Sequence, residues 1–158
     1  EGELVEFLNQ NCESTLREGL EELYRHNPEA ALVSKEKGKL FIDHDLTHVI
    51  FGCDTSLAGE MLLKPWTILG TTISIKEMKK YAADPEIQKI DKEGIALMGG
   101  MFKGTLKVIF YYVPQIFWIW LTQVRKMNKK WPHSDITEEM LDAKICDLRE
   151  EYNIAFVN

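Results

Sequence analysis

The segment from residue 44 to residue 60, HDLTHVIFGCDTSLAGE, concentrates side chains that could bind a metal ion. His44 and His48 stand four residues apart, so on a helix both imidazoles point from one face on adjacent turns. Asp45 is offset by about 60° from His48 at 3.6 residues per turn, so the same helix also offers a carboxylate. Imidazole nitrogens and carboxylate oxygens are ligands that zinc takes in proteins. The spacing therefore predicts a metal site formed by His44, Asp45, His48 and, further along the chain, Glu60.

Glu60 reaches this site only if the chain turns back on itself. Gly52 predicts a helix end, because glycine readily takes the left-handed conformation that follows many helices. Asp54 or Thr55 then predicts the cap of the next helix. At about 1.5 Å per residue, His48 and Glu60 both lie roughly 6 to 9 Å from the turn. An antiparallel helical hairpin would bring the two side chains level.

Two other kinds of metal site begin with similar residues. The HDxxH spacing resembles the HExxH motif of metalloproteases, but Asp45 is one methylene shorter than the glutamate that serves there as general base. A His–Asp pair also begins the site of HD-type phosphohydrolases, which need a further histidine and aspartate, and only His26 and Asp54 could supply them. Both alternatives fit less well than the hairpin site. His26 and His133 adjoin chain-breaking residues, and we expect both to be exposed.

The elements that must position these residues are predicted to be helices. Apolar residues recur at helical spacing along most of the chain, and the only β-branched run is 66–75. The helix boundaries predicted from capping and breaking residues are N-termini at Ser74–Glu77, Asp84–Pro85 and Asp135–Glu138, and a C-terminus at Gly94. We therefore predict an all-α fold, a single domain over residues 1–158, built as a helical bundle with the metal site on a hairpin and an apolar groove.

Composition narrows the function further. The chain has 158 residues, 45% hydrophobic and 28% charged, which is ordinary for a globular domain. Its net charge of −6 gives no sign of a nucleic-acid partner. The three cysteines form no CxxC pair, so we expect a reducing compartment rather than a disulfide framework. The first residues are acidic, unlike the basic start of a secretory signal, and we expect an intracellular protein.

The stretch 108–124, VIFYYVPQIFWIWLTQV, contains six aromatic residues and is followed by a basic segment. It is shorter than the roughly 20 residues of a membrane-spanning helix and contains Pro114. Three interpretations remain open: a buried central helix, one wall of an apolar lipid-binding groove, and a surface that contacts a membrane through its aromatic residues and basic flank. The residues predicted to contact lipid are Val108, Tyr111, Tyr112, Phe117 and Trp118.

The motif and its surroundings resemble the Coq-four family of ubiquinone-biosynthesis proteins. HDxxH followed by eleven residues and a glutamate is the signature of that family, and His44, Asp45, His48 and Glu60 match it position by position. The HVIFG run after the motif, the LAGE ending at Glu60, and the PWTILG segment at 65–70 agree with the family pattern. The LREEYNI segment at 148–154 is similar to the family's closing LREELGI. The resemblance covers residues 40 to 154, and the chain is shorter than typical members.

The resemblance implies an all-helical zinc protein that acts on a prenylated quinone precursor. The activity attributed to the family is removal of the ring carboxyl of a polyprenyl-hydroxybenzoate, with oxidation at that carbon. We therefore expect His44, His48 and Glu60 as ligands and Asp45 as a fourth ligand or as the catalytic acid or base. Without Asp45 the ligand set would also suit ferrous iron. The alternative is a non-catalytic scaffold that presents prenyl lipids to other enzymes.

The resemblance also implies partners and a location. Family members associate with membranes and with other ubiquinone-biosynthesis enzymes, so we expect a protein peripheral to the inner membrane, on its cytoplasmic side in a bacterium or its matrix side in a mitochondrion. The Gly100–Gly104 spacing would allow the close helix packing of a homodimer, although in a glycine-rich turn such a spacing more often belongs to a loop, so the oligomeric state stays open.

Overall fold

The structure is a computed structural model that describes residues 5–156, apart from the side chains of Ile90 and Val108. Over these residues it is all-α, as predicted, and contains no β-strand, only two isolated bridges. The α-helices are α1 (Leu16–His26), α2 (Pro28–Lys37), α3 (Lys39–Phe51), α4 (Leu57–Gly70), α5 (Ile75–Ala82), α6 (Pro85–Leu97), α7 (Gly100–Lys107), α8 (Val113–Thr122), α9 (Glu138–Asp142) and α10 (Ile145–Tyr152). Two 3-10 helices, η1 (Glu6–Leu8) and η3 (Val124–Lys126), and one π-helix, η2 (Val108–Tyr112), complete the described elements.

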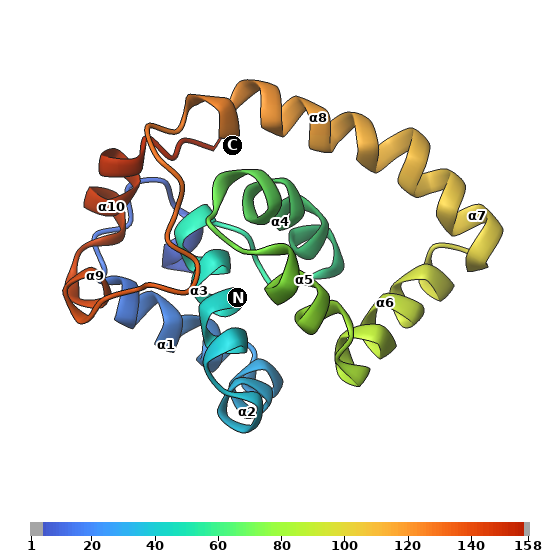
Figure 1. Cartoon of the computed structure of the whole chain (residues 1–158), viewed down its shortest axis with the longest axis horizontal. Coiled ribbons are helices and arrows are strands. Elements are labelled where there is room, and N and C mark those ends of the chain that lie inside the picture. The colour runs from blue at the N-terminus through green and yellow to red at the C-terminus, as the bar shows by residue number, and fades with distance from the viewer. Residues whose placement is uncertain (1–4, 157–158) are drawn as a thin grey trace.

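Helix α3 lies at the centre of the molecule (Figure 1). It contacts α1, α2, α4, α5 and α10, and every residue from 45 to 51 is buried. A helix that is enclosed on all sides is apolar on most of them, which explains why the run from Leu46 to Phe51 shows no polar stripe. The packing partners are apolar residues of the neighbouring helices, among them Leu16, Leu63 and Ile145. The two histidines of the motif are therefore carried by the most enclosed helix of the described chain.

Several predicted helix starts are confirmed. Ser74 and Glu77 form a complete capping box at the start of α5. Asp84 caps α6, and Pro85 occupies its first turn. Proline fits there because the first-turn N–H has no partner within the helix. These short-range signals succeed because all the groups they involve lie within one turn.

Two predicted boundaries are wrong. Helix α6 continues past Gly94 to Leu97. A Cβ at Gly94 would lie 2.9 Å from the Leu57 side chain, so this glycine makes room for a close contact rather than ending the helix. The predicted cap at Asp135 is replaced by Thr137, which caps the short helix α9. The chain then becomes extended at Lys144, where it pairs with Thr15, and a second helix begins at Ile145.

Arg149 of α10 joins the central helix to the N-terminal segment. Its buried guanidinium donates to the carbonyl oxygens of Val49 at 2.8 Å and Ile50 at 2.9 Å, near the C-terminal end of α3. It also donates to the carbonyl of Phe7 at 2.6 Å. Burial lowers the pKa of Arg149 to about 10, so the side chain remains charged at neutral pH. The positive charge meets the negative end of the α3 dipole and fixes that end in place.

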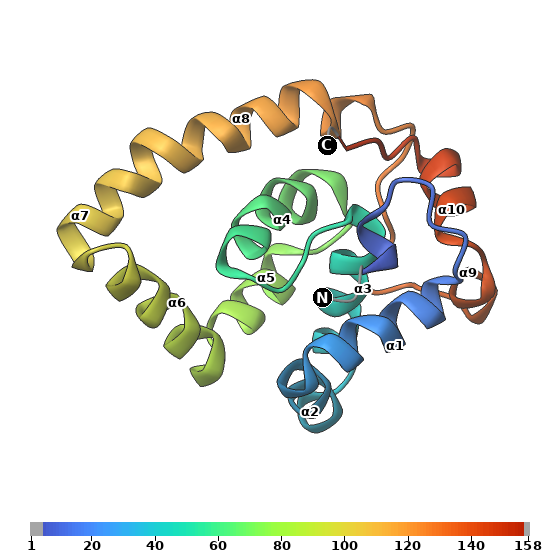
Figure 2. The same cartoon turned by 180° about the vertical axis from the view of Figure 1, so that it is seen from behind.

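Residues 100–122 form one long element of α7, η2 and α8, which we call the aromatic arm. It runs along one edge of the molecule in the front view (Figure 1) and in the view from behind (Figure 2). The hydrogen-bond pattern of the helix changes to that of a π-helix just before Pro114. The nitrogen of Pro114 has no proton to donate to the usual helical hydrogen bond. Helix α8 of this arm packs against α4, and α7 packs against α6. The arm therefore touches the rest of the molecule along a single side.

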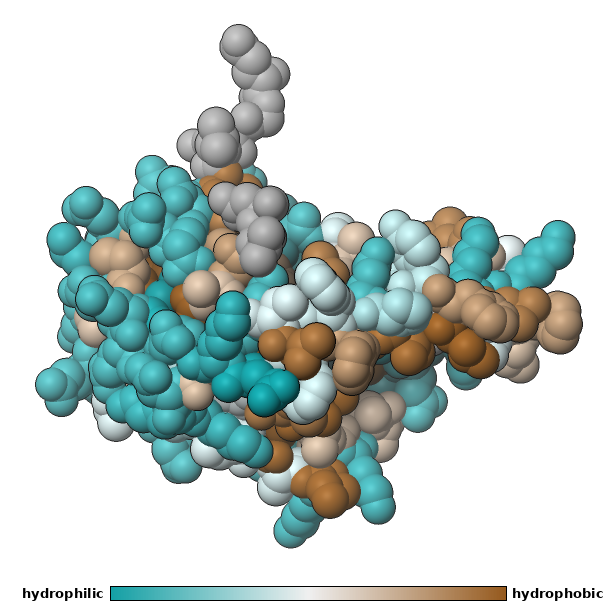
Figure 3. Space-filling view, turned by 90° about the horizontal axis from the view of Figure 1, so that it is seen from above, coloured by the Kyte–Doolittle hydropathy of each residue, from teal (hydrophilic) through white to brown (hydrophobic). Residues whose placement is uncertain are grey.

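The prediction of a buried central helix for residues 108–124 is wrong. Phe110, Tyr111, Phe117 and Trp118 are 58 to 75% exposed, and α8 has no buried residue. Seen from above, hydrophobic surface gathers along the arm (Figure 3). The segment is apolar on all its faces, but only one face packs on α4 and the remaining faces are exposed. Within residues 5–156, no helix has both the length and the apolarity required to cross a bilayer.

Candidate metal centre

The α3–α4 hairpin brings three of the predicted ligands together. His44 and His48 lie one turn apart on α3, with their Nε2 atoms 3.2 Å from each other. Gly52 takes the left-handed conformation at the end of α3, as predicted, with φ 62° and ψ 39°. Ser56 then caps α4, rather than the predicted Asp54 or Thr55, and Asp54 instead accepts a hydrogen bond from the Ser56 backbone.

Glu60 stands in the first turn of α4 and faces both imidazoles. Its Oε1 lies 3.0 Å from Nε2 of His48, and its Oε2 lies 3.7 Å from Nε2 of His44. Ligand atoms of the three residues all fall within 4.8 Å of one another. The hairpin geometry inferred from the spacing is therefore present, and it forms a group that could hold a metal ion.

The hydrogen bonds of His48 favour its metal-binding form. Its Nδ1 lies 3.2 Å from the carbonyl oxygen of Cys53, which can only accept a proton. Nδ1 is therefore the protonated nitrogen, and in the neutral ring Nε2 carries a lone pair. That lone pair points toward Oε1 of Glu60, and two acceptors 3.0 Å apart repel unless a cation or a proton lies between them. The donor set fits a divalent ion, and a backbone carbonyl such as that of Cys53 is a partner that metal-binding histidines commonly use for their other ring nitrogen.

The charges of the site are coupled. Burial alone would raise the pKa of Glu60, but hydrogen bonds with His44 and His48 hold it well below its usual range. Burial would likewise lower the pKa of His48, and the charges of Glu60 and Asp45 raise it instead. Without a metal, Nε2 of His48 and Oε1 of Glu60 face each other at a distance that favours a shared proton. A metal ion would replace the shared proton, so metal binding should release protons.

Asp45 lies outside the group of three. Its Oδ2 accepts hydrogen bonds from the hydroxyl of Tyr24, at 3.0 Å, and from the hydroxyl of Ser34. The side chain is buried, and burial raises its pKa above the usual value. Its assignments as fourth ligand and as catalytic acid or base stay predictions. No signal in the sequence links Tyr24 or Ser34 to Asp45, because both come from other helices.

Two further residues border the site. Tyr81 of α5 packs its ring against His44, with centroids 4.5 Å apart and planes tilted by 32°. His133, expected to be exposed, has no exposed surface, and its backbone N–H donates to Thr72. Burial lowers the pKa of His133 to about 4, with a further contribution from the charge of His44. The exposure prediction failed because the neighbouring Trp131 pairs with Thr71 and draws this segment into the fold.

No known protein gives these site residues a function by similarity. Comparisons with protein-family models, curated proteins and solved structures found no match. The functional inference therefore depends on the residues of the site and their contacts.

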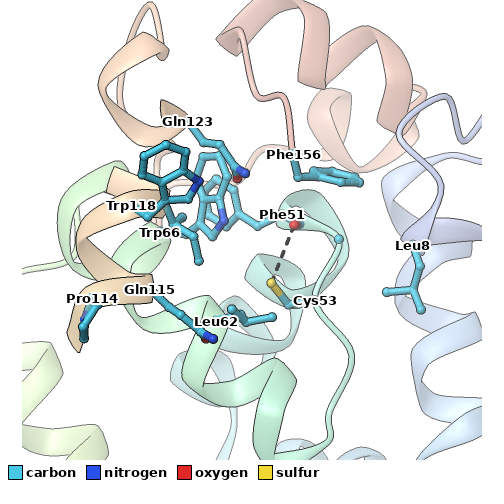
Figure 4. Close-up of a pocket in the computed structure, with 12 residues that line it drawn as sticks. Leu8, Phe51, Cys53, Leu62, Trp66, Pro114, Gln115, Trp118, Gln123 and Phe156 are labelled. Atoms are coloured by element: carbon cyan, nitrogen blue, oxygen red, sulfur yellow. Dashed lines mark hydrogen bonds between the residues drawn. The ribbon is translucent and has the colours of Figure 1, made fainter. Parts of the chain in front are cut away.

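A cavity of about 660 Å³ lies between α4, α8 and the C-terminal segment (Figure 4). Its walls are mainly apolar, with Gln115 and Gln123 as polar groups. The other lining residues are Leu8, Phe51, Gly52, Cys53, Leu62, Trp66, Pro114, Trp118, Ile119 and Phe156. Burial raises the pKa of the Cys53 thiol to about 12, so this thiol stays protonated and behaves as an apolar wall group.

Of the residues predicted to contact lipid, Trp118 lines this cavity. Tyr111 and Phe117 are exposed on the arm, Tyr112 is half-buried, and none of the three lines it. The side chain of Val108 falls outside the described part of the structure. The sequence did not indicate that the cavity would combine α8 with Phe51 and Trp66, because those residues come together only when α4 packs against both helices.

Proposed function

We propose that this protein binds one divalent metal ion through His44, His48 and Glu60 and acts as a decarboxylase on a prenylated aromatic acid of ubiquinone biosynthesis. The observation that carries the proposal is the convergence of the three ligand atoms within 4.8 Å. The resemblance of the motif to the Coq-four signature supports the choice of substrate. Two histidines and one carboxylate suit zinc with open coordination positions, and they also suit ferrous iron.

The proposed reaction breaks the bond between the aromatic ring and its carboxyl carbon. The electron pair stays on the ring carbon, carbon dioxide leaves, and a proton takes the vacated position. A bound metal supplies a Lewis acid that holds a phenolate or carboxylate oxygen and stabilises negative charge. Asp45 is the proposed acid or base, the role expected from the resemblance; burial raises the pKa of its carboxyl, and hydrogen bonds from Ser34 and Tyr24 oppose that rise. In the oxidative form, dioxygen is a co-reactant that accepts two electrons and two protons and leaves as hydrogen peroxide, carbon dioxide leaves the ring, and a hydroxyl group from water takes the vacated position.

The cavity supports binding of a prenyl chain, but its position also favours a second candidate function. On α4, Leu62 and Trp66 point about 160° and 120° away from Glu60 at 100° per residue. The cavity and the ligand group thus lie on different faces of this helix, joined by Cys53, whose carbonyl contacts His48. A lipid held there would sit apart from the metal. The second candidate is therefore a scaffold that carries a prenyl lipid in the cavity and keeps the metal for structure.

The aromatic arm supports a membrane partner for either function. Residues 94–134 contain six basic residues and no acidic one, although the whole chain has a net charge of −6. The six are Lys103, Lys107, Arg125, Lys126, Lys129 and Lys130. Exposed aromatic side chains flanked by such residues favour the surface of an anionic bilayer. Lys129 also pairs with Glu151, so five of the six remain for lipid headgroups. Other enzymes of the pathway are proposed partners on the strength of the resemblance alone.

One experiment separates the candidates. Cells that lack the protein receive the polyprenyl-hydroxybenzoate together with wild-type, His48→Ala or Glu93→Gln protein, and the decarboxylated product is measured by mass spectrometry. Glu93 is an exposed acid far along the chain and serves as the control. A decarboxylase requires product with the wild type and control but not with His48→Ala. Equal product from all three variants would exclude the catalytic function. A co-purified isoprenoid without turnover would support the scaffold.

A further inference from the structure

Tyr81 occupies a place beside the ligand group that no sequence motif indicated. Its ring lies between two rings of α3, 4.5 Å from His44 and 5.1 Å from Phe41. Helix α5 is held there by the capping box at its start and by a hydrogen bond from Ser134 to Glu77. The ring therefore restricts the orientation of the His44 imidazole, which has no carbonyl contact comparable to that of His48.

The position of Tyr81 coincides with the open side of the site. The side chain of His48 is 1% exposed, whereas those of His44 and Glu60 are 13% and 32% exposed. A ligand must enter from the side of His44 and Glu60, where Tyr81 packs. The half-buried Tyr24 already donates its hydroxyl to Asp45. The hydrogen bonds among the described residues leave the Tyr81 hydroxyl free, and of the acids whose charges act on it, Glu60 contributes most, ahead of Asp45, Asp91 and Asp84.

We propose that Tyr81 completes the site in two ways. Its ring holds His44 in the orientation in which Nε2 faces Glu60, and its hydroxyl donates a hydrogen bond to an anionic oxygen of a ligand bound at the site. This inference rests on the proposed function and names the recognition of its substrate head group, a phenolate or carboxylate. A neutral phenol donates well to such an oxygen, and hydrogen bonds to charged acceptors are the stronger kind.

The test uses zinc and 4-hydroxybenzoate as probes on the purified full chain, with isothermal titration for each. Tyr81→Phe keeps the ring and removes the hydroxyl, whereas Tyr81→Leu removes both. Tyr152→Phe removes a hydroxyl from α10, outside the ligand group and the cavity lining, and serves as the matched control. For Tyr81→Phe we expect unchanged zinc affinity and an affinity of the zinc-loaded protein for 4-hydroxybenzoate that is about ten-fold lower. For Tyr81→Leu we expect zinc affinity to fall as well, by about ten-fold.

The outcomes distinguish this inference from the proposed function. Wild-type affinity for 4-hydroxybenzoate in Tyr81→Phe, or wild-type zinc affinity in Tyr81→Leu, would overturn the corresponding role of Tyr81 and leave the metal site intact. A wild-type protein that binds zinc but not 4-hydroxybenzoate would overturn the hydroxyl's role alone. A wild-type protein that binds no zinc would overturn both proposals. Circular dichroism of each variant confirms that it is folded before titration.

Discussion

The α3–α4 hairpin holds polar groups inside the molecule, whereas the aromatic arm holds apolar groups on its surface. In the hairpin, Asp45 and His48 are buried, and each has hydrogen-bond partners. In the arm, Phe110 and Trp118 are among the most exposed hydrophobic side chains of the described residues. The hairpin is an exception to the rule that polar residues lie outside, and the arm is an exception to the rule that apolar residues lie inside. Such exceptions are the informative positions of a structure. The hairpin could hold a metal ion between fixed side chains, and we propose that the arm contacts a surface outside the fold.

The largest effect is expected where the hairpin is anchored. Replacing Arg149 by methionine should lower the free energy of unfolding by about 4 kcal/mol, because buried carbonyl oxygens at the end of α3 lose their donor. Replacing Arg125, an exposed residue after the arm, should change it by less than about 0.5 kcal/mol. Urea denaturation of both methionine variants measures the contrast. Similar losses for the two would show that Arg149 does not anchor α3.

The next effect concerns the metal. Zinc at about 100 times its dissociation constant should raise the free energy of unfolding by about 2.7 kcal/mol, since it binds the folded state. Chelation should reverse the gain. Glu60→Gln should remove it, because the carboxylate that faces both imidazoles is lost, and the exposed Glu93→Gln should retain it. Thermal or urea unfolding with and without zinc measures this, and a gain that survives in Glu60→Gln would exclude the proposed ligand group.

A smaller effect follows from the buried histidine beside the hairpin. The pKa of His133 is lowered by burial to about 4, below the unfolded value of about 6.5. The unfolded state therefore binds more protons between these values, so stability is full above pH 6.5 and falls as the pH drops toward 4. We expect His133 to account for about 2 kcal/mol of that loss by pH 5. Its nearest charged groups are His44, Glu77 and Lys39.

The measurement is urea denaturation of metal-free protein from pH 7 to pH 4, compared with His133→Asn. Other groups, such as the pair of His48 and Glu60, titrate in both proteins and cancel in the difference. The variant should be less stable at pH 7 and lose less stability on acidification. Parallel pH profiles would mean that His133 stays accessible to protons in the folded state.

The sequence predicted the hairpin far better than its surroundings. His44, His48 and Glu60 could be found because helical periodicity and one turn fix their relative positions. Tyr81 could not, since it approaches His44 only through the packing of α5 against α3. The interpretation of residues 108–124 as a buried helix failed for the same reason. Apolar residues indicate burial, but they do not identify the surface that buries them. Local signals gave the helix starts at Ser74 and Asp84, and they failed at Asp135, where Thr137 caps the helix instead.

The smallest effect on stability is expected in the arm, and it would sharpen the contrast most. Phe117→Ser should change the free energy of unfolding by less than about 0.5 kcal/mol, because the side chain is 58% exposed. Phe51→Ser, in the wall shared by α3 and the cavity, should cost about 3 to 5 kcal/mol, because that ring is buried against Trp66. The same chemical change thus separates a residue that supports the fold from one that does not.

Phe117→Ser, which should affect stability less than Phe51→Ser, should affect binding to lipid more. Phe117→Ser should weaken binding to vesicles of phosphatidylcholine and phosphatidylglycerol by about 1 kcal/mol, or roughly five-fold, because a half-exposed aromatic ring loses its apolar contact. Pure phosphatidylcholine vesicles should bind less, since the basic residues around the arm then lack anionic partners. Flotation of the vesicles measures both. If Phe117→Ser binds like the wild type while it also dissociates a dimer in sedimentation, the arm contacts a second copy of the chain instead of a bilayer.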